Sequence, residues 1–249
     1  MKIGIITAMP EEFNAVAKSL GAAVSGRLGR YRSGRFRAAG HDVILVESGM
    51  GFGNAAAAAA TLLRAEKFDL LISTGFCGGV APELQAGDLV VAEKILTVSG
   101  RGSEELPAHF APVGQSFVAA QAAEGKRIFR GTFASTATIT SKSALAGILS
   151  GRYPCPVVEM ESGAIVAIAA ENSVPLLAIR AVSDCAAEEL AFSLDKFCDA
   201  DLRRIRPAKV LLTILRKPYI IPQLLRLSRS SRRAAESITS ALSALFPTL

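Results

Sequence analysis

The sequence predicts an α/β fold, a three-layer α/β/α arrangement around a central mixed, mostly parallel sheet. Short apolar runs alternate with longer helical patterns along residues 1–202, an order typical of a sheet covered on both faces. Half of the 249 residues are hydrophobic, which is enough for a sizeable core. Trp is absent and aromatic residues make up 6%, so this core must consist of Ala, Leu, Ile and Val.

Each predicted element follows from a local pattern. The strands are short apolar runs bounded by polar residues or glycine. Pro10 favours a helix start, and six consecutive alanines from Ala55 favour the second helix. Strands are predicted at 2–7, 42–47, 70–74, 88–95, 128–134, 156–160 and 175–182. Helices are predicted at 11–20, 55–64, 141–149 and 164–171, and a loop at 99–112.

The net charge of +6 is unevenly divided. Residues 202–249 carry ten Lys or Arg and one acid, a balance of +9. Residues 1–201 therefore carry 18 basic and 21 acidic residues, a balance of −3, which argues against a nucleic-acid-binding body. We predict a catalytic domain at 1–202 and a basic amphipathic helical extension at 203–249 that packs on the same domain.

The extension is open to two interpretations. Apolar residues at helical spacing, with prolines as breaks, favour two or three helices packed on the body or on a partner subunit. The alternative is contact of the basic helices with an anionic membrane surface or an amphiphilic substrate. No secretory core and no run of about 18 apolar residues is present. We therefore expect a cytoplasmic protein, with a peripheral place at the membrane as the alternative.

The four cysteines and two histidines have no metal-binding spacing, so we expect reduced thiols and no metal site. Charged residues at strand ends are more informative. Glu159 and Glu161 would share one face of a strand, with Met160 on the other. Arg180 lies within the next apolar run and Asp184 follows it. Because burying an unpaired charge costs several kcal/mol, these groups need a ligand or a buried ion pair.

Two glycine-rich segments, 49–53 and 74–79, follow predicted strands and are interpreted as turns that let a ligand approach the backbone. Neither is a Walker loop, because no Gly-Lys-Ser/Thr follows. A dinucleotide-binding enzyme is disfavoured, because no Gly-x-Gly-x-x-Gly follows the first strand. Glu11 and Glu12 stand just inside a helix start, where complementing the helix dipole would alone explain them.

Together these residues resemble the methylthioadenosine/S-adenosylhomocysteine nucleosidases of the purine nucleoside phosphorylase superfamily. The resemblance covers roughly residues 1–200 and is weakest at 97–150. The tail contains Lys217-Pro218-Tyr219-Ile220-Ile221-Pro222-Gln223-Leu224-Leu225-Arg226-Leu227-Ser228-Arg229. This pattern is similar to the ending of the hopanoid-associated nucleosidase/phosphorylase branch, which acts on adenosylhopane. The segments that carry the family resemblance are Met1-Lys2-Ile3-Gly4-Ile5-Ile6, Ala8-Met9 with Glu11-Glu12, Ser48-Gly49, Thr74-Gly75 with Gly78-Gly79, Gly87-Asp88-Leu89-Val90-Val91, Val158-Glu159-Met160-Glu161 and Arg180-Ala181-Val182-Ser183-Asp184.

The resemblance implies a phosphorylase/hydrolase-like fold and a homodimer that hydrolyses the N-glycosidic bond of a 5′-substituted adenosine without a cofactor. It implies Asp184 as the acid that protonates the purine, Glu12 as the general base and Arg180 as a group that positions the attacking water. It also implies that Glu161 binds the ribose hydroxyls and that Met160 packs against the sugar. The substrate-binding residues that it implies are Met9, Met50, Gly75, Phe76, Phe133, Thr138, Glu159, Met160, Glu161 and Ser183.

One position departs from the family pattern. The nucleosidases usually have Ser after Thr-Gly in the second glycine segment, whereas this chain has Phe76, whose side chain cannot hydrogen-bond water. Phosphorolysis, with phosphate as co-substrate, and a catalytically weak nucleoside-binding protein therefore stay open as alternatives. The presence of Glu12 favours water as the nucleophile.

Overall fold

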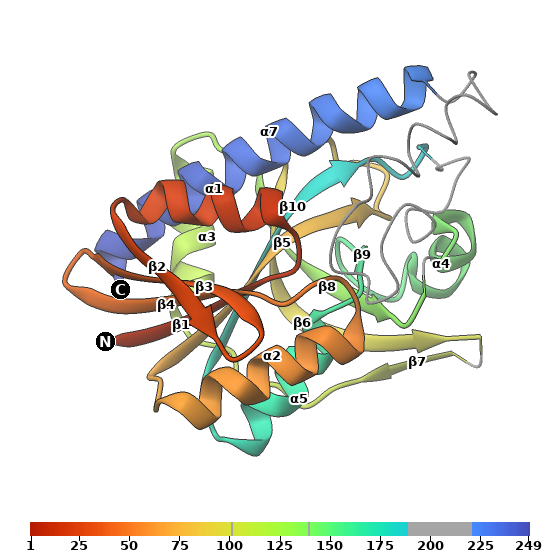
Figure 1. Ribbon diagram of the computed structural model, residues 1–249. Helices are drawn as coiled ribbons and strands as arrows, with labels where there is room; N and C mark the ends of the chain where they lie inside the picture. The colour runs from red at the N-terminus through yellow and green to blue at the C-terminus, as the bar shows by residue number, and fades with distance from the viewer. Residues whose placement is uncertain (101, 139, 189–220) are drawn as a thin grey trace.

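The computed structural model describes residues 1–100, 102–138, 140–188 and 221–249, and one mixed sheet forms its centre (Figure 1). The strands are β1 Lys2–Thr7, β2 Ala23–Leu28, β3 Tyr31–Ala38, β4 His41–Glu47, β5 Leu70–Gly79, β6 Leu89–Ser99, β7 Gly102–Glu105, β8 Ile128–Thr136, β9 Val157–Glu159 and β10 Leu176–Asp184. The helices are α1 Pro10–Leu20, α2 Phe52–Ala65, α3 Val113–Ala123, α4 Lys142–Leu149, α5 Ser162–Glu171 and α7 Ile221–Leu245, followed by a 3₁₀ turn at Phe246–Thr248.

The strand order is β10-β6-β8-β9-β5-β1-β4-β3-β2, with β7 paired to β6. Because β10 pairs with β5 as well as with β6, the five strands β5, β9, β8, β6 and β10 close on themselves like a small barrel. Parallel pairs join β4, β1, β5 and β10, whereas β2, β3 and β7 add antiparallel pairs. The predicted mixed sheet is confirmed, with a larger antiparallel share than expected.

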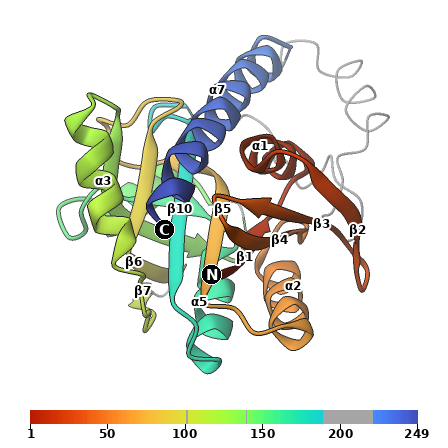
Figure 2. The same ribbon diagram turned by 90° about the vertical axis from the view of Figure 1, so that its left-hand side faces the viewer.

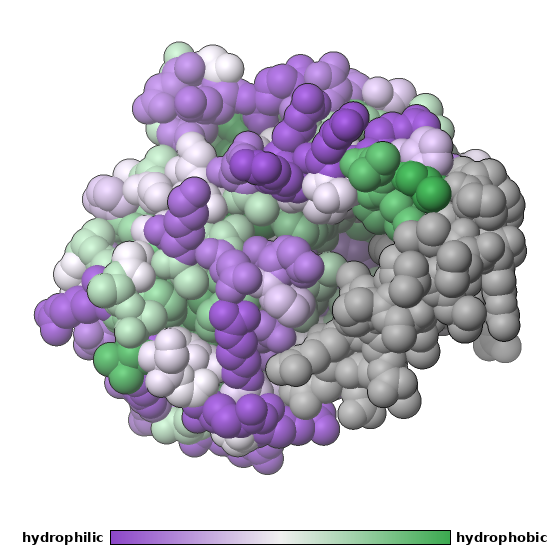
Figure 3. Space-filling view, turned by 45° about the horizontal axis from the view of Figure 1, so that its top comes forward, coloured by the Kyte–Doolittle hydropathy of each residue, from purple (hydrophilic) through white to green (hydrophobic). Residues whose placement is uncertain are grey.

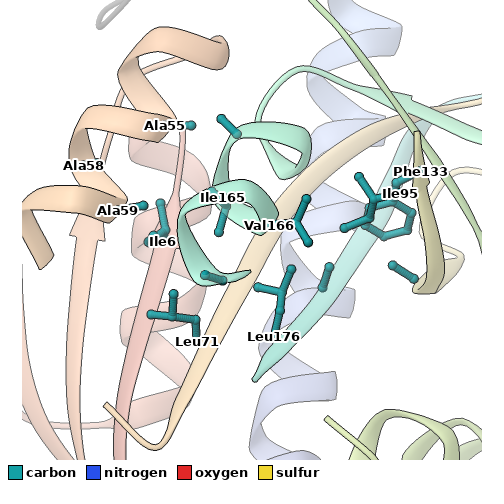
Figure 4. Close-up of a cluster of buried hydrophobic side chains, with 14 of the residues drawn as sticks. Ile6, Ala55, Ala58, Ala59, Leu71, Ile95, Phe133, Ile165, Val166 and Leu176 are labelled. Carbon is teal, nitrogen blue, oxygen red and sulfur yellow. The ribbon is translucent and has the colours of Figure 1, made fainter. Parts of the chain in front are cut away.

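Helices cover both faces of the sheet, which confirms the three-layer prediction (Figures 1 and 2). On one face, α2 and α5 pack against the strands through small side chains. Ala55, Ala58 and Ala59 of α2 are completely buried, and Ile165 of α5 is almost so (Figure 4). On the other face, α1, α3 and α7 bury a second cluster. Alanine in α2 lets this helix and α5 lie close together on the strands.

Helix α7 is an integral part of the second face of the core. Its buried residues are spaced so that they lie on one side of the helix. Its Thr239 hydroxyl donates a hydrogen bond to the Ala15 carbonyl of α1 at 2.9 Å. The buried residues are Ala234, Ile238, Ala241, Leu242 and Leu245. The first turns are more exposed, and apolar surface gathers at that end of the helix, where Ile221 and Leu225 are 39% and 54% exposed (Figure 3). No helix in the described part of the chain is long and apolar enough to cross a membrane.

The structure differs from the sequence prediction in several elements. Strands β2, β3 and β7 and helix α3 were not predicted, and β7 occupies part of the predicted loop at 99–112. The predicted turn at 74–79 is wrong, because β5 continues through it to Gly79. Of the tail predicted at 203–249, the structure describes residues 221–249, which form α7 and the 3₁₀ turn after it, so the prediction of two or three helices stays a prediction. Residues 203–220 and the boundary after residue 202 lie outside the described residues, so the two-part division stays a prediction.

Truncating a buried leucine of α7 tests whether this helix supports the fold. Leu242→Ala leaves a cavity in the core, so we expect the free energy of unfolding to fall by about 2–5 kcal/mol. The matched change Leu225→Ala removes an exposed side chain of the same helix, and we expect an effect within about 0.5 kcal/mol. Urea denaturation measures both. Equal effects of the two changes would contradict the packing of α7 on the core.

Candidate active site

Two adjacent strand ends form the base of the candidate site. Strand β10 runs parallel to β5, with Arg180 opposite Gly75 and Asp184 opposite Gly78. A register shift between Val182 and Asp184 ends the regular pairing, so Asp184 does not follow the regular alternation of side chains along the strand. At roughly 3.3 Å per residue, Arg180 and Asp184 are separated by about 13 Å along the strand. The site is therefore extended, with one charged group at each end.

At the first end, the buried side chain of Arg180 pairs with two carboxylates. It is 1% exposed, and its Nη2 lies 2.8 Å from Glu159 Oε2 and 3.5 Å from Glu161 Oε2. Nη2 also lies within hydrogen-bonding distance of the hydroxyls of Ser73 and Ser162, at 3.4 and 3.2 Å. The ion pair that the sequence left open as an explanation of Arg180 is thus present.

Glu159 and Glu161 approach Arg180 at the junction between β9 and α5. Glu159 Oε2 accepts hydrogen bonds from the backbone N–H groups of Glu161 and Ser162 at 3.0 and 2.7 Å, so it also holds the start of α5. Glu161 Oε1 accepts from the Gly51 N–H at 2.8 Å. The glycine turn after β4 therefore positions a carboxylate 110 residues away, a role that the sequence did not suggest.

Glu12 joins this group from the start of α1. Its Oε2 accepts from the backbone N–H groups of Ala8 and Met9 at 2.8 and 2.9 Å, and its Oε1 accepts from the Phe76 N–H at 2.7 Å. The backbone N–H of Phe76 therefore holds the Glu12 carboxyl group, although the Phe76 side chain offers no hydrogen bond to water. A Cβ atom on Gly75 would lie 2.5 Å from Glu12 Oε1 and 2.4 Å from Arg180 Nη1, so only glycine leaves room for both side chains.

Burial and mutual contact set the protonation of these groups. Burial raises the pKa of Glu161 to about 7, against the lowering effect of Arg180. Burial also raises the pKa of Glu12, although Arg180 and three backbone N–H groups lower it. For Arg180, burial lowers the pKa, but Glu159, Glu161 and Glu12 together raise it above its ordinary value. Glu161 and Glu12 can therefore exchange protons closer to neutral pH than ordinary carboxyls.

At the other end of the site, Asp184 receives two donors. Ser183 Oγ lies 2.6 Å from Asp184 Oδ1, and the Lys142 ammonium forms an ion pair with Oδ2. Lys142 Nζ also donates to the carbonyls of Cys185 and Glu188 at 2.6 and 2.9 Å. The sequence analysis did not find Lys142. The sequence feature that could have identified Lys142 is its place at the start of a helix, where the helix dipole disfavours a positive charge.

Asp184 also borders a cavity of about 160 Å³. One wall is the turn after β10, and the other wall is the N-terminal half of α7. The residues of α7 that line the cavity are Gln223, Arg226, Leu227 and Ser230. Gln223 Oε1 has no hydrogen-bond partner among the described residues. The tail predicted from the sequence therefore contributes directly to the surroundings of the candidate acid.

The remaining predicted contacts differ in their placement. Met9, Met50 and Met160 are half-buried beside Glu12, Gly51 and Glu161, their neighbours in the chain. Ser183 is buried, and its hydroxyl lies 3.2 Å from the Cys77 carbonyl of β5.

Phe133 does not join the site. It is completely buried in the core beside Ile95 and Val166, so it presents no surface to a ligand (Figure 4). Its prediction as a purine contact is corrected by this packing. Thr138 is exposed between β8 and α4, and its role stays a prediction.

Comparisons with known proteins identify the family of the chain. The family model described as the phosphorylase superfamily matches residues 2–216. A 5′-methylthioadenosine/S-adenosylhomocysteine nucleosidase of Aeromonas salmonicida is 33% identical over 215 residues, which is 80% of this chain and 93% of that protein. The nucleosidase of the same name from Actinobacillus succinogenes is 31% identical over 210 residues, 79% of this chain and 91% of its own.

Solved structures share the fold. A Neisseria meningitidis 5′-methylthioadenosine/S-adenosylhomocysteine nucleosidase, in complex with methylthio-immucillin-A, superimposes with a TM-score of 0.75 at 22% identity, covering 100% of this chain and 99% of that one. The futalosine hydrolase of Helicobacter pylori gives 0.76 at 16% identity, covering 100% and 98%. The predicted phosphorylase-like fold is confirmed. These relatives give no support to the hopanoid-associated branch, which stays a prediction.

The crowding at Gly75 yields a stability prediction. Gly75→Ala forces a methyl group against Glu12 and Arg180, so we expect the free energy of unfolding to fall by about 1–3 kcal/mol. Gly147→Ala, in the open interior of α4, should raise it by roughly 0.5–1 kcal/mol. Urea denaturation measures both variants. A Gly75→Ala protein as stable as the parent would contradict the packing described at this position.

The protonation of Glu161 yields a pH prediction. Its pKa is about 7 in the folded protein and ordinarily 4.5, so the folded state binds a proton in this window that the unfolded state has released. The free energy of unfolding should therefore fall as the pH rises from about 4.5 to about 7, by at most roughly 3 kcal/mol from this group. Denaturation at several pH values measures the slope. Glu161→Gln should flatten it, whereas Glu11→Gln, at an exposed neighbour of Glu12, should not. The same slope in both variants would exclude Glu161 as its origin.

Proposed function

The chain belongs to the phosphorylase superfamily and, within it, to the 5′-methylthioadenosine/S-adenosylhomocysteine nucleosidases, and from this membership we propose that it hydrolyses the N-glycosidic bond of a 5′-substituted adenosine and releases adenine. One observation of the site carries the assignment to this chain. Three carboxylates surround a buried arginine in the middle of β10, and a fourth carboxylate borders a cavity at the C-terminal end of the same strand. This separation suits a ribose at one end and a purine at the other.

Asp184 is assigned to the leaving purine. When the bond between C1′ and N9 breaks, its electron pair goes to the purine, which leaves more easily if N7 receives a proton. Asp184 must therefore hold a proton at that moment. Its Oδ1 can carry this proton, because the Ser183 hydroxyl that now donates to Oδ1 can turn its hydrogen to the Cys77 carbonyl, 3.2 Å away.

Glu161 is assigned to the ribose. Positive charge develops on the sugar as the bond breaks, and a carboxylate nearby stabilises it while it accepts hydrogen bonds from ribose hydroxyls. The contact with Gly51 N–H fixes one of its oxygens. The half-buried Met160 is assigned to pack against the sugar.

Glu12 is assigned as the general base for the attacking water. Its raised pKa makes it a stronger base than an ordinary glutamate, and it takes the proton that the water loses on attacking C1′. The backbone N–H of Phe76 holds one oxygen of Glu12. Arg180 keeps the neighbouring carboxylates in place. A carboxylate at the nucleophile position repels phosphate, which favours hydrolysis over phosphorolysis.

Adenine release tests the proposal directly. We expect the full-length protein to release adenine from methylthioadenosine or S-adenosylhomocysteine in phosphate-free buffer, measured by chromatography. An absolute requirement for phosphate would instead make the protein a phosphorylase. Binding of nucleosides without any release would identify it as a catalytically weak relative.

Two conservative variants test the residue roles. Asp184→Asn and Glu12→Gln each remove a proton-transferring group, so we expect kcat to fall by about 10²–10⁴-fold with the fold retained. Glu11→Gln is the matched control for Glu12→Gln, because it changes the exposed neighbour, and we expect it to stay within about twofold. A normal kcat in either first variant would overturn its assigned role.

The expected homodimer, the cytoplasmic location and the alternative contact of the basic helices with a membrane stay predictions. The four arginines of α7 support a surface contact of the kind proposed for the tail, whereas its buried stripe supports packing on the body. A liposome-binding assay with anionic vesicles distinguishes these alternatives.

A further inference from the structure

Lys142 has a position that helix stability does not explain. It is the first residue of α4, where the positive end of the helix dipole disfavours a cation, and yet its side chain is 9% exposed. Burying an ammonium group is costly unless its donors are all satisfied. Here three acceptors meet it: Asp184 Oδ2 and the carbonyls of Cys185 and Glu188.

All three acceptors belong to the end of β10 and the turn after it. This turn is closed by its own hydrogen bonds, since Glu188 N–H donates to the Cys185 carbonyl at 3.0 Å and Cys185 N–H to Glu188 Oε2 at 3.2 Å. Lys142 therefore ties a small closed turn, and the carboxyl group before it, to the start of α4. The same turn contributes Ala187 and Glu188 to the wall of the cavity beside Asp184.

The strand below leaves space for this arrangement. A Cβ atom on Gly78 of β5 would lie 3.0 Å from Lys142 Cε and 3.2 Å from Asp184 Oδ2. The lysine stem and the carboxyl group thus lie together over a glycine. The contact involves residues from α4, β5 and β10 and is a built feature of the fold, unlike an ion pair between two mobile surface side chains.

We propose that Lys142 is the positioning residue of the acid, and that it decides which oxygen of Asp184 carries the catalytic proton. This inference rests on the proposed function. A carboxylic acid has one oxygen that accepts and one that donates. The ammonium group has only donors, so it fixes Oδ2 as the accepting oxygen. The proton is then confined to Oδ1, the oxygen assigned to purine N7, while the Ser183 hydroxyl turns its hydrogen to the Cys77 carbonyl.

A comparison of two purines tests this inference without catalysis. Adenine has N7 as an acceptor, whereas 7-deazaadenine has a C–H group there. We expect the parent protein to bind adenine about tenfold more tightly, the value of one hydrogen bond in a desolvated site, by calorimetry. Lys142→Met removes the ammonium at similar length, so this preference should fall below about twofold. Lys142→Arg keeps a donor-only cation and should retain most of it.

Lys94→Met is the matched control, since it removes a lysine whose ion pair with Glu105 is exposed, and the tenfold preference should persist. If Lys142→Met weakens both purines equally, Lys142 has only a structural role and the proposal fails. The proposal also fails if the parent protein shows no preference, even where adenine release has established the proposed function. Should Lys142→Met not fold, Lys142→Gln supports the same comparison, because its amide can also accept and so no longer fixes Oδ2.

Discussion

The buried guanidinium of Arg180 is the interaction on which the rest of the site depends. It lies among Glu159, Glu161 and Glu12, three carboxyl groups that could not share a buried space without a cation. Each carboxyl is also held by backbone N–H groups, from the start of α5, the turn after β4 and the start of α1. One arginine therefore fixes the relative positions of three separate segments. Burial, which Arg180 offsets only in part, raises the pKa of Glu161 to about 7 and also raises the pKa of Glu12.

Much of this arrangement could be predicted from the sequence, because apolar runs and strand ends are local signals. The strands at 2–7 and 128–134 followed from such signals, and the ion pair of Arg180 with Glu159 and Glu161 was one of the two explanations that the sequence left open. Strands β2 and β3 did not, because their exposed faces are polar and their apolar residues few. The segment 74–79 was interpreted as a turn because of its glycines, although the glycines serve to make room above a continuous strand.

The other features that could not be predicted from the sequence are contacts between segments far apart in the chain. Lys142 pairs with a residue 42 positions later, and neither residue has a local pattern that requires the other. Gly51 and Glu161 are even further apart. Phe133 illustrates the opposite error, because an aromatic residue near a site resembles a ligand contact until packing shows that it fills the core. A sequence pattern can identify residues that are able to do chemistry, but the pairing of distant strands determines which of these residues come into contact.

Helix α7 joins two regions that are otherwise separate. With 25 residues at 1.5 Å each it is about 37 Å long, with Leu242 and Leu245 anchored in the core and Gln223 and Arg226 beside Asp184. A helix of this kind opens cooperatively, since its backbone hydrogen bonds overlap from turn to turn. Occupation of the cavity beside Asp184 should therefore slow amide hydrogen exchange along this helix as far as its end. The C-terminal residues of the chain are in this sense thermodynamically linked to the Asp184 end of the site, although no side chain there reaches it.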